Sequence, residues 1–207
     1  MVFEVPYNGA DQDTNSPATS LGSPRSELRG TLADGNEDNW QPLGTNILEG
    51  TCIVNATNLG SGKVIIGQVH GKTPYSVASV VVNYNYPNAQ DVSVTFKDRA
   101  DGNDGPDNDL PPQSDRNIPL ATGVSLGAMI HYKVELVGTS TSLVLNATFN
   151  GGTTETRTMY QNGDLNWNDS TWLTSYFYFK AGCYFPKAPT NSSAKVTFSS
   201  LTATHTQ

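Results

Sequence analysis

The chain has 207 residues, of which only 15% are charged, and its formal net charge is −7 at pH 7. This charge argues against a nucleic-acid partner, which would need a basic surface, and any anionic ligand must be held by a local group of cations. No run of 18 apolar residues occurs, so we expect no membrane-spanning helix and no membrane partner. The length suits a single domain covering residues 1–207.

Strand-like runs fill most of the chain, and no convincing helical period is present. Residues 1–22 are polar and turn-rich, which predicts an extended surface arm, and residues 32–46 predict a loop. Strands are expected at 23–31, 47–57, 63–70, 77–86, 91–97, 129–137, 141–149, 153–159, 173–184 and 194–204. About ten strands without helices predict an all-β fold, an antiparallel sandwich of the jelly-roll type.

Residues 98–119 predict an acidic loop with aspartates at six positions. Its central run, Asp-Gly-Asn-Asp-Gly-Pro-Asp-Asn-Asp, suggests a calcium loop. The spacing does not fit an EF-hand, because Gly105 stands where the fifth position needs an oxygen ligand and no Glu closes the loop. We therefore interpret it as a solvated loop and expect no metal site and no cofactor.

The expected location is outside the cell, although residues 1–6 lack the basic and apolar regions of a signal peptide. Four N-x-S/T sequons suit a secreted glycoprotein, but such triplets also arise by chance in a chain rich in Asn, Ser and Thr. They begin at Asn55, Asn146, Asn168 and Asn191. Two cysteines, Cys52 and Cys183, allow one disulfide or two free core thiols, and they cannot form a zinc site by themselves.

Two of the predicted strands gather charged or polar side chains on one face. In 23–31, Arg25, Glu27 and Arg29 lie on the same face, and we expect the carboxylate to fix the guanidinium groups. The alternative is a solvated, salt-bridged face. At the end of 63–70, Gln68 and His70 share a face.

The stretch 176–184 is rich in aromatic residues and alternates between two faces. One face is apolar and suits a core: Phe179, Ala181 and Cys183. The other carries two phenols, an ammonium and a glycine that leaves space for a ligand: Tyr178, Lys180, Gly182 and Tyr184. This second face predicts a binding surface, and the alternative is an amphipathic strand with a hydrated outer face.

Together, these stretches resemble the three signature blocks of polysaccharide lyase family 7, the alginate lyases, whose patterns are R-[ST]-E-L-R, Q-[IV]-H and Y-F-K-A-G-x-Y. Here the blocks read Arg25-Ser26-Glu27-Leu28-Arg29, Gln68-Val69-His70 and Tyr178-Phe179-Lys180-Ala181-Gly182-Cys183-Tyr184. They occur in the family's order. The departure follows Tyr184, where Phe185-Pro186 replaces the usual Asn-Gln. The resemblance implies two curved antiparallel sheets with the substrate in a concave groove.

The resemblance also implies a β-elimination. A lyase of this family removes the C5 proton of a 1,4-linked uronate and expels the 4-linked oxygen. Arg25 and Gln68, assisted by His70, would neutralise the sugar carboxylate. Tyr184 would take the proton and then protonate the leaving oxygen; for guluronate, His70 would be the base. A tyrosine base needs cationic neighbours, and Arg25, Arg29 and Lys180 are the candidates. We also expect substrate contacts from four residues: Glu27, Arg29, Tyr178 and Lys180.

We therefore expect a monomeric, endo-acting alginate lyase whose partner is an anionic polysaccharide. Val69 occupies the centre of its block, where family members with valine tend to prefer mannuronate, so polymannuronate is the expected substrate. Two alternatives remain open at this point. One is a non-catalytic jelly-roll module that binds acidic polysaccharide, and the other is a lyase for another polyuronate such as glucuronan.

Overall fold

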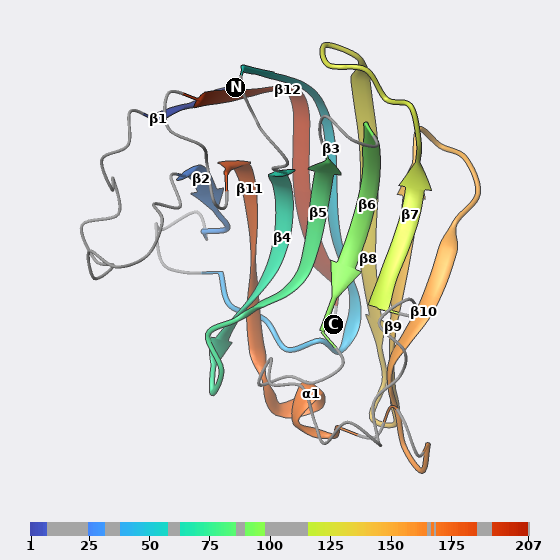
Figure 1. The fold of residues 1–207 in the computed structure, drawn as a ribbon. Helices are drawn as coiled ribbons and strands as arrows, with labels where there is room; N and C mark the ends of the chain where they lie inside the picture. Colours follow the sequence, from blue (N-terminus) through green and yellow to red (C-terminus); the bar gives the residue numbers. More distant parts are fainter. Residues whose placement is uncertain are drawn as a thin grey trace.

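The computed structural model describes residues 1–7, 25–31, 38–57, 63–85, 90–97, 116–164, 167, 169–185 and 192–206. These residues form two six-stranded antiparallel sheets that pack face to face, with one short helix, α1 (Thr171–Thr174), before β11 (Figure 1). The predicted all-β jelly-roll class is confirmed. Within the described ranges, no helix has the length and apolar character needed to cross a membrane.

We call one layer the back sheet. Its strand order is β1-β12-β3-β8-β9-β10. The bounds are β1 Val2–Tyr7, β12 Ser192–Thr206, β3 Gly44–Thr57, β8 Met129–Gly138, β9 Ser142–Phe149 and β10 Glu155–Gln161.

We call the other layer the site sheet, and it lies in front in Figure 1. Its order is β2-β11-β4-β5-β6-β7, so a strand from near the end of the chain lies between two from its first third. The bounds are β2 Arg25–Arg29, β11 Tyr176–Tyr184, β4 Lys63–Thr73, β5 Ala78–Asn85, β6 Asp91–Phe96 and β7 Asn117–Ala121.

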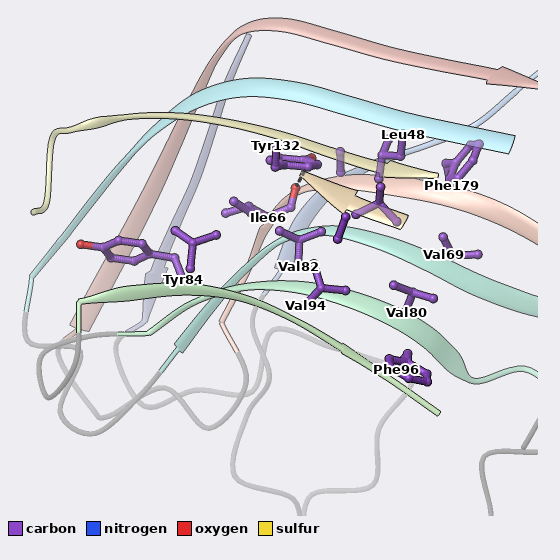
Figure 2. Close-up of a cluster of buried hydrophobic side chains, with 14 of the residues drawn as sticks. Leu48, Ile66, Val69, Val80, Val82, Tyr84, Val94, Phe96, Tyr132 and Phe179 are labelled. Carbon is purple, nitrogen blue, oxygen red and sulfur yellow. Dashed lines mark hydrogen bonds between the residues drawn. The ribbon is translucent and has the colours of Figure 1, made fainter. Parts of the chain in front are cut away.

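The core lies between the sheets and follows from the alternation of side chains along each strand. In β5, for example, Val80, Val82 and Tyr84 are at most 1% exposed and contribute to the cluster shown in Figure 2. Fully burying one such aliphatic side chain contributes about 1.5–3 kcal/mol. This packed layer holds the site sheet in place from behind.

A hydrogen bond across the core supports β4 directly. Tyr132, on β8, donates its hydroxyl to the carbonyl oxygen of Ile66 at 3.1 Å (Figure 2). In β4, Ile65 pairs with Asn83 and Gly67 with Val82, so Ile66 is the extra residue of a β-bulge. A buried carbonyl that is not bonded within the sheet needs another donor, and the Tyr132 hydroxyl supplies it for Ile66.

Three parts of the fold differ from the sequence prediction. The polar arm expected over 1–22 is wrong at its start, because β1 pairs with β12 and buries Phe3 and Val5. Within the predicted loop 98–119, residues 117–119 belong to β7, while the calcium-like run lies outside the described residues. The strand expected from 173 begins at Tyr176, because α1 precedes it.

Candidate active site

Strand β11 is the centre of the candidate site, with β2 on one side and β4 on the other. Across these three strands the register aligns Arg29 with Lys180 and Lys180 with Gln68. It also sets Tyr184 opposite Arg25, and Tyr178 opposite His70. The structure thus brings the eight predicted site residues to three adjacent strands: Arg25, Glu27, Arg29, Gln68, His70, Tyr178, Lys180 and Tyr184.

Two of the site residues are buried although they lie on the outer face of the sheet. Gln68 is 2% exposed and Tyr178 6% exposed. The next residue on each strand, Val69 after Gln68 and Phe179 after Tyr178, belongs to the core cluster as predicted. Hydrogen bonds and charges around Gln68 and Tyr178 are therefore partly shielded from water, which strengthens them.

Both arginines of β2 lie over aromatic rings. The Cζ atom of Arg25 is 4.7 Å from the ring centre of Tyr184, and that of Arg29 is 3.6 Å from the ring centre of Tyr178. Such cation–π contacts hold a guanidinium in place without neutralising it. The two contacts therefore place both guanidinium groups beside the tyrosines of β11.

Glu27 does not fix the guanidinium groups as the sequence predicted. Its carboxylate accepts a hydrogen bond from Nε2 of Gln68, and its Oε2 lies 3.8 Å from Nζ of Lys180. Gly182, opposite Glu27 on β11, explains this reach, because a Cβ at that position would lie 2.7 Å from the Cα of Glu27. Without a side chain at 182, β2 approaches β11 closely and Glu27 can contact residues beyond its own strand.

Burial shifts the titration of the Glu27–Lys180 pair. It raises the pKa of Glu27, although Lys180, the Gln68 hydrogen bond and Arg25 favour the ionised form. Burial likewise lowers the pKa of Lys180, an effect that Glu27 opposes and that Arg25 and Arg29 reinforce. A second carboxylate beside Lys180 would stabilise its protonated form, so this cluster favours the binding of an anion.

His70 is held with a proton on Nδ1. That nitrogen lies 2.8 Å from the carbonyl oxygen of Gly71, which can only accept a hydrogen bond. Burial lowers the pKa of His70, and the charges of Lys180, Arg29 and Arg25 lower it further. A neutral ring with Nδ1 protonated leaves a lone pair on Nε2, so His70 can accept a proton or a hydrogen bond there.

Comparison with known proteins decides the family. The model of the family described as alginate lyase matches residues 1–205. The chain belongs to the alginate lyase family. The prediction from the three sequence blocks is confirmed, and the enzyme is a polysaccharide lyase. No curated protein is similar enough in sequence to count as a match.

Solved structures of alginate lyases share the fold. One from Pseudomonas aeruginosa is 26% identical with a TM-score of 0.72, and the alignment covers 99% of this chain and 82% of that one. The alginate lyase A1-II′, described as a member of polysaccharide lyase family 7, is 24% identical with a TM-score of 0.68, over 99% of this chain and 79% of that one. One from Corynebacterium sp. is 18% identical with a TM-score of 0.60, and the alignment covers 99% of this chain and 94% of that one.

The cysteines of this alginate lyase do not form the disulfide that the sequence allowed. Cys52 and Cys183 are both buried free thiols. Burial raises the pKa of each to about 12; for Cys183, Glu27 and Glu4 contribute as well. They are part of the core cluster, where a thiol packs as a small apolar group.

Sequence reasoning missed the segment behind Arg29. Asn39 accepts a hydrogen bond from Nη2 of Arg29 at 3.3 Å, and Trp40 pairs with Phe177 of β11 through two backbone hydrogen bonds of 2.8 and 2.9 Å. Both residues were assigned to a loop, and no local pattern marks them.

Among the described residues, no group of three or more metal-binding side chains is present.

Proposed function

We propose that this alginate lyase cuts its polymer internally by β-elimination, with Tyr184 transferring the proton. The observation that supports this is the placement of Arg25, Gln68, His70 and Tyr184 on one face of the three adjacent strands β2, β11 and β4. The set contains a cation and an amide for the sugar carboxylate and two groups that can exchange a proton.

The reaction needs help at two points. The C5–H bond is weakly acidic because the neighbouring carboxylate is already negative, and the developing charge must be stabilised. When the base takes the C5 proton, the electron pair forms the C4–C5 double bond and the bond from C4 to the bridging oxygen breaks. That oxygen leaves with a proton from the acid, so the products are a saturated and a 4,5-unsaturated sugar end.

Arg25 and Gln68 are the proposed carboxylate ligands, because a neutral His70 with its Nδ1–H bound to Gly71 has no N–H left to donate to the carboxylate. One N–H of the Gln68 amide is engaged by Glu27, which orients the side chain and leaves the other N–H for substrate. Arg25 contributes a charge that a carboxylate can meet with two parallel hydrogen bonds. Preorganised donors of this kind are each worth about 3–4 kcal/mol in a transition state.

Tyr184 is the proposed base and acid for mannuronate. Its half-buried ring lies under the Arg25 guanidinium, so a positive charge lies beside the ring whose hydroxyl exchanges the proton. For guluronate, whose C5 proton lies on the opposite face of the sugar, Nε2 of His70 is the proposed base and Tyr184 the acid. The role of base agrees with a neutral His70, whose pKa is lowered by burial.

We propose polymannuronate as the preferred block. Val69 is 1% exposed and faces the core, so it acts only by seating Gln68 and His70. A difference of one methylene in a packed site is worth about 1–3 kcal/mol, which tilts a preference without excluding the other block.

We further propose that the enzyme acts as a secreted monomer. Recovery of the enzyme from the culture medium would test secretion, and its elution volume in gel filtration would test the monomeric state.

The direct test is ultraviolet absorbance of the unsaturated product on polymannuronate, polyguluronate and glucuronan. We expect the highest initial rate on polymannuronate, together with a fall in viscosity that precedes the release of small oligosaccharides. Activity on glucuronan alone would overturn the assignment of the polymer, and release of only the shortest products from the first minutes would overturn the internal mode of cleavage.

A further inference from the structure

A cationic hollow lies on the site sheet beyond β4, on the side away from β11 and Tyr184. Its volume is about 480 Å³. Three of the residues that line it are cations: Lys63, Lys97 and Arg116. None of its described lining residues is acidic, in a chain whose net charge is −7. Cationic side chains gathered around a hollow are the arrangement that an anion site needs.

The hollow is in register with the active site. Gln68 pairs with Val81, Val81 with Thr95, and Thr95 with Asn117. The row that carries Arg29, Lys180 and Gln68 therefore continues without a break across β5, β6 and β7. Since neighbouring strands are about 4.8 Å apart, Thr95 and Asn117 lie roughly 10 and 14 Å from Gln68 at the backbone. A polysaccharide crossing the strands from the active site would reach this hollow within a few sugars.

Lys97 is the most informative of the three cations. It follows β6 directly and shares the face of Thr95, and its backbone N–H donates to the carbonyl of Ser79 at 2.9 Å. Its side chain is partly buried, and it has no ion-pair partner within the part of the chain that the structure describes. Partial burial without a counter-charge makes binding of a carboxylate favourable.

The rest of the lining suits a sugar as well as its charge. Ala78 and Val81 provide an apolar surface for the C–H face of a pyranose, while Thr95 and Asn117 carry side chains that can bond hydroxyl groups. A simple inorganic anion would use the cations and leave these groups without a partner. The combination therefore favours a uronate residue.

We propose that the hollow binds the carboxylate of an uncleaved uronate residue a few sugars away from the cleaved bond. This inference rests on the proposed function and adds a determinant of substrate length to it. The hollow holds long chains by a contact that the reacting sugar does not make. Its contribution is to binding, equal in ground state and transition state, so it lowers KM and leaves kcat unchanged.

The test compares Lys97→Met with the charge-conserving Lys97→Arg. Lys133→Met is the control, because Lys133 is on β8 in the back sheet, pairs with Glu135 at 3.2 Å, and its loss changes the net charge equally. On polymannuronate we expect Lys97→Met to raise KM about tenfold at unchanged kcat, and the other two variants to stay within about twofold of wild type. On the shortest oligosaccharide that the wild type cleaves, Lys97→Met should match the wild type.

An unchanged KM in folded Lys97→Met, or an equal rise in Lys133→Met, would overturn the inference. If Lys97→Met does not fold, Asn117→Asp replaces it, since this exposed residue would place a carboxylate in the hollow and should raise KM on the polymer alone. If the wild type cleaves no polyuronate, the proposed function fails. Migration in gels containing polymannuronate then decides. If the polymer retards the wild type but not Lys97→Met, the inference about the hollow is supported. If it retards both proteins equally, the inference is overturned.

Discussion

Replacing Tyr132 by phenylalanine removes the hydroxyl that ties the two sheets together beneath the site. The donor and the acceptor, the Ile66 carbonyl, are both buried, and the bulge leaves Ile66 without a register partner on β5. An orphaned buried carbonyl costs about 1–3 kcal/mol, and we expect about 2 kcal/mol here. With a urea dependence of about 2 kcal/mol per molar, the unfolding midpoint should fall by roughly 1 M.

Tyr84→Phe is the matched control. Tyr84 is also fully buried, and its hydroxyl donates to the carbonyl of Val124 at 2.7 Å, in a less buried setting that water can enter. Its loss should cost about 1 kcal/mol. Only Tyr132 supports the bulge two residues before Gln68, so only its loss should move Gln68 and His70 and lower kcat, on the order of threefold to tenfold.

Urea unfolding and initial rates on polymannuronate, measured on both variants, check this reasoning. A Tyr132→Phe protein with wild-type stability would show that the bulge does not need the hydroxyl. Equal losses of kcat in the two variants would show that the activity depends on general stability rather than on support of β4.

Three further predictions concern titration, packing and the thiols. The pKa of His70 should lie below that of an ordinary histidine because of burial, and Lys180→Met should raise it by removing a nearby positive charge, as seen by NMR of the ring protons. Gly182→Ala should cost more than about 2 kcal/mol and most of the activity, because the new methyl collides with the backbone of β2; unfolding and rate assays check both. Cys52 and Cys183 should resist alkylating reagents in the native enzyme, and both should react once the unreduced protein is unfolded.

The faces of the site strands could be predicted from the sequence because side chains alternate strictly along a strand. That rule placed Tyr178, Lys180 and Tyr184 together and sent Phe179 and Cys183 to the core, as the structure shows. Local alternation also identified most of the strands. It needs no knowledge of which strands are neighbours.

Features that depend on strand neighbours could not be predicted. The partner of Glu27 is set by β11 lying between β2 and β4, which joins segments more than 100 residues apart. Strict alternation back from Gln68 would expose Ile66 on the site face, whereas the bulge returns it to the core. The cationic hollow combines residues from β4 to β7, and β1 is a strand only because β12 pairs with it.

The rate of Tyr184→Phe on polymannuronate tests the central claim most directly. Tyr176→Phe is its control, because Tyr176 begins the same strand and is 40% exposed. Absorbance of the unsaturated product should show turnover reduced by about 10²–10⁴-fold in Tyr184→Phe and unchanged in Tyr176→Phe, with equal thermal unfolding midpoints. Near-normal turnover in folded Tyr184→Phe would remove Tyr184 from the proton transfer and contradict the account.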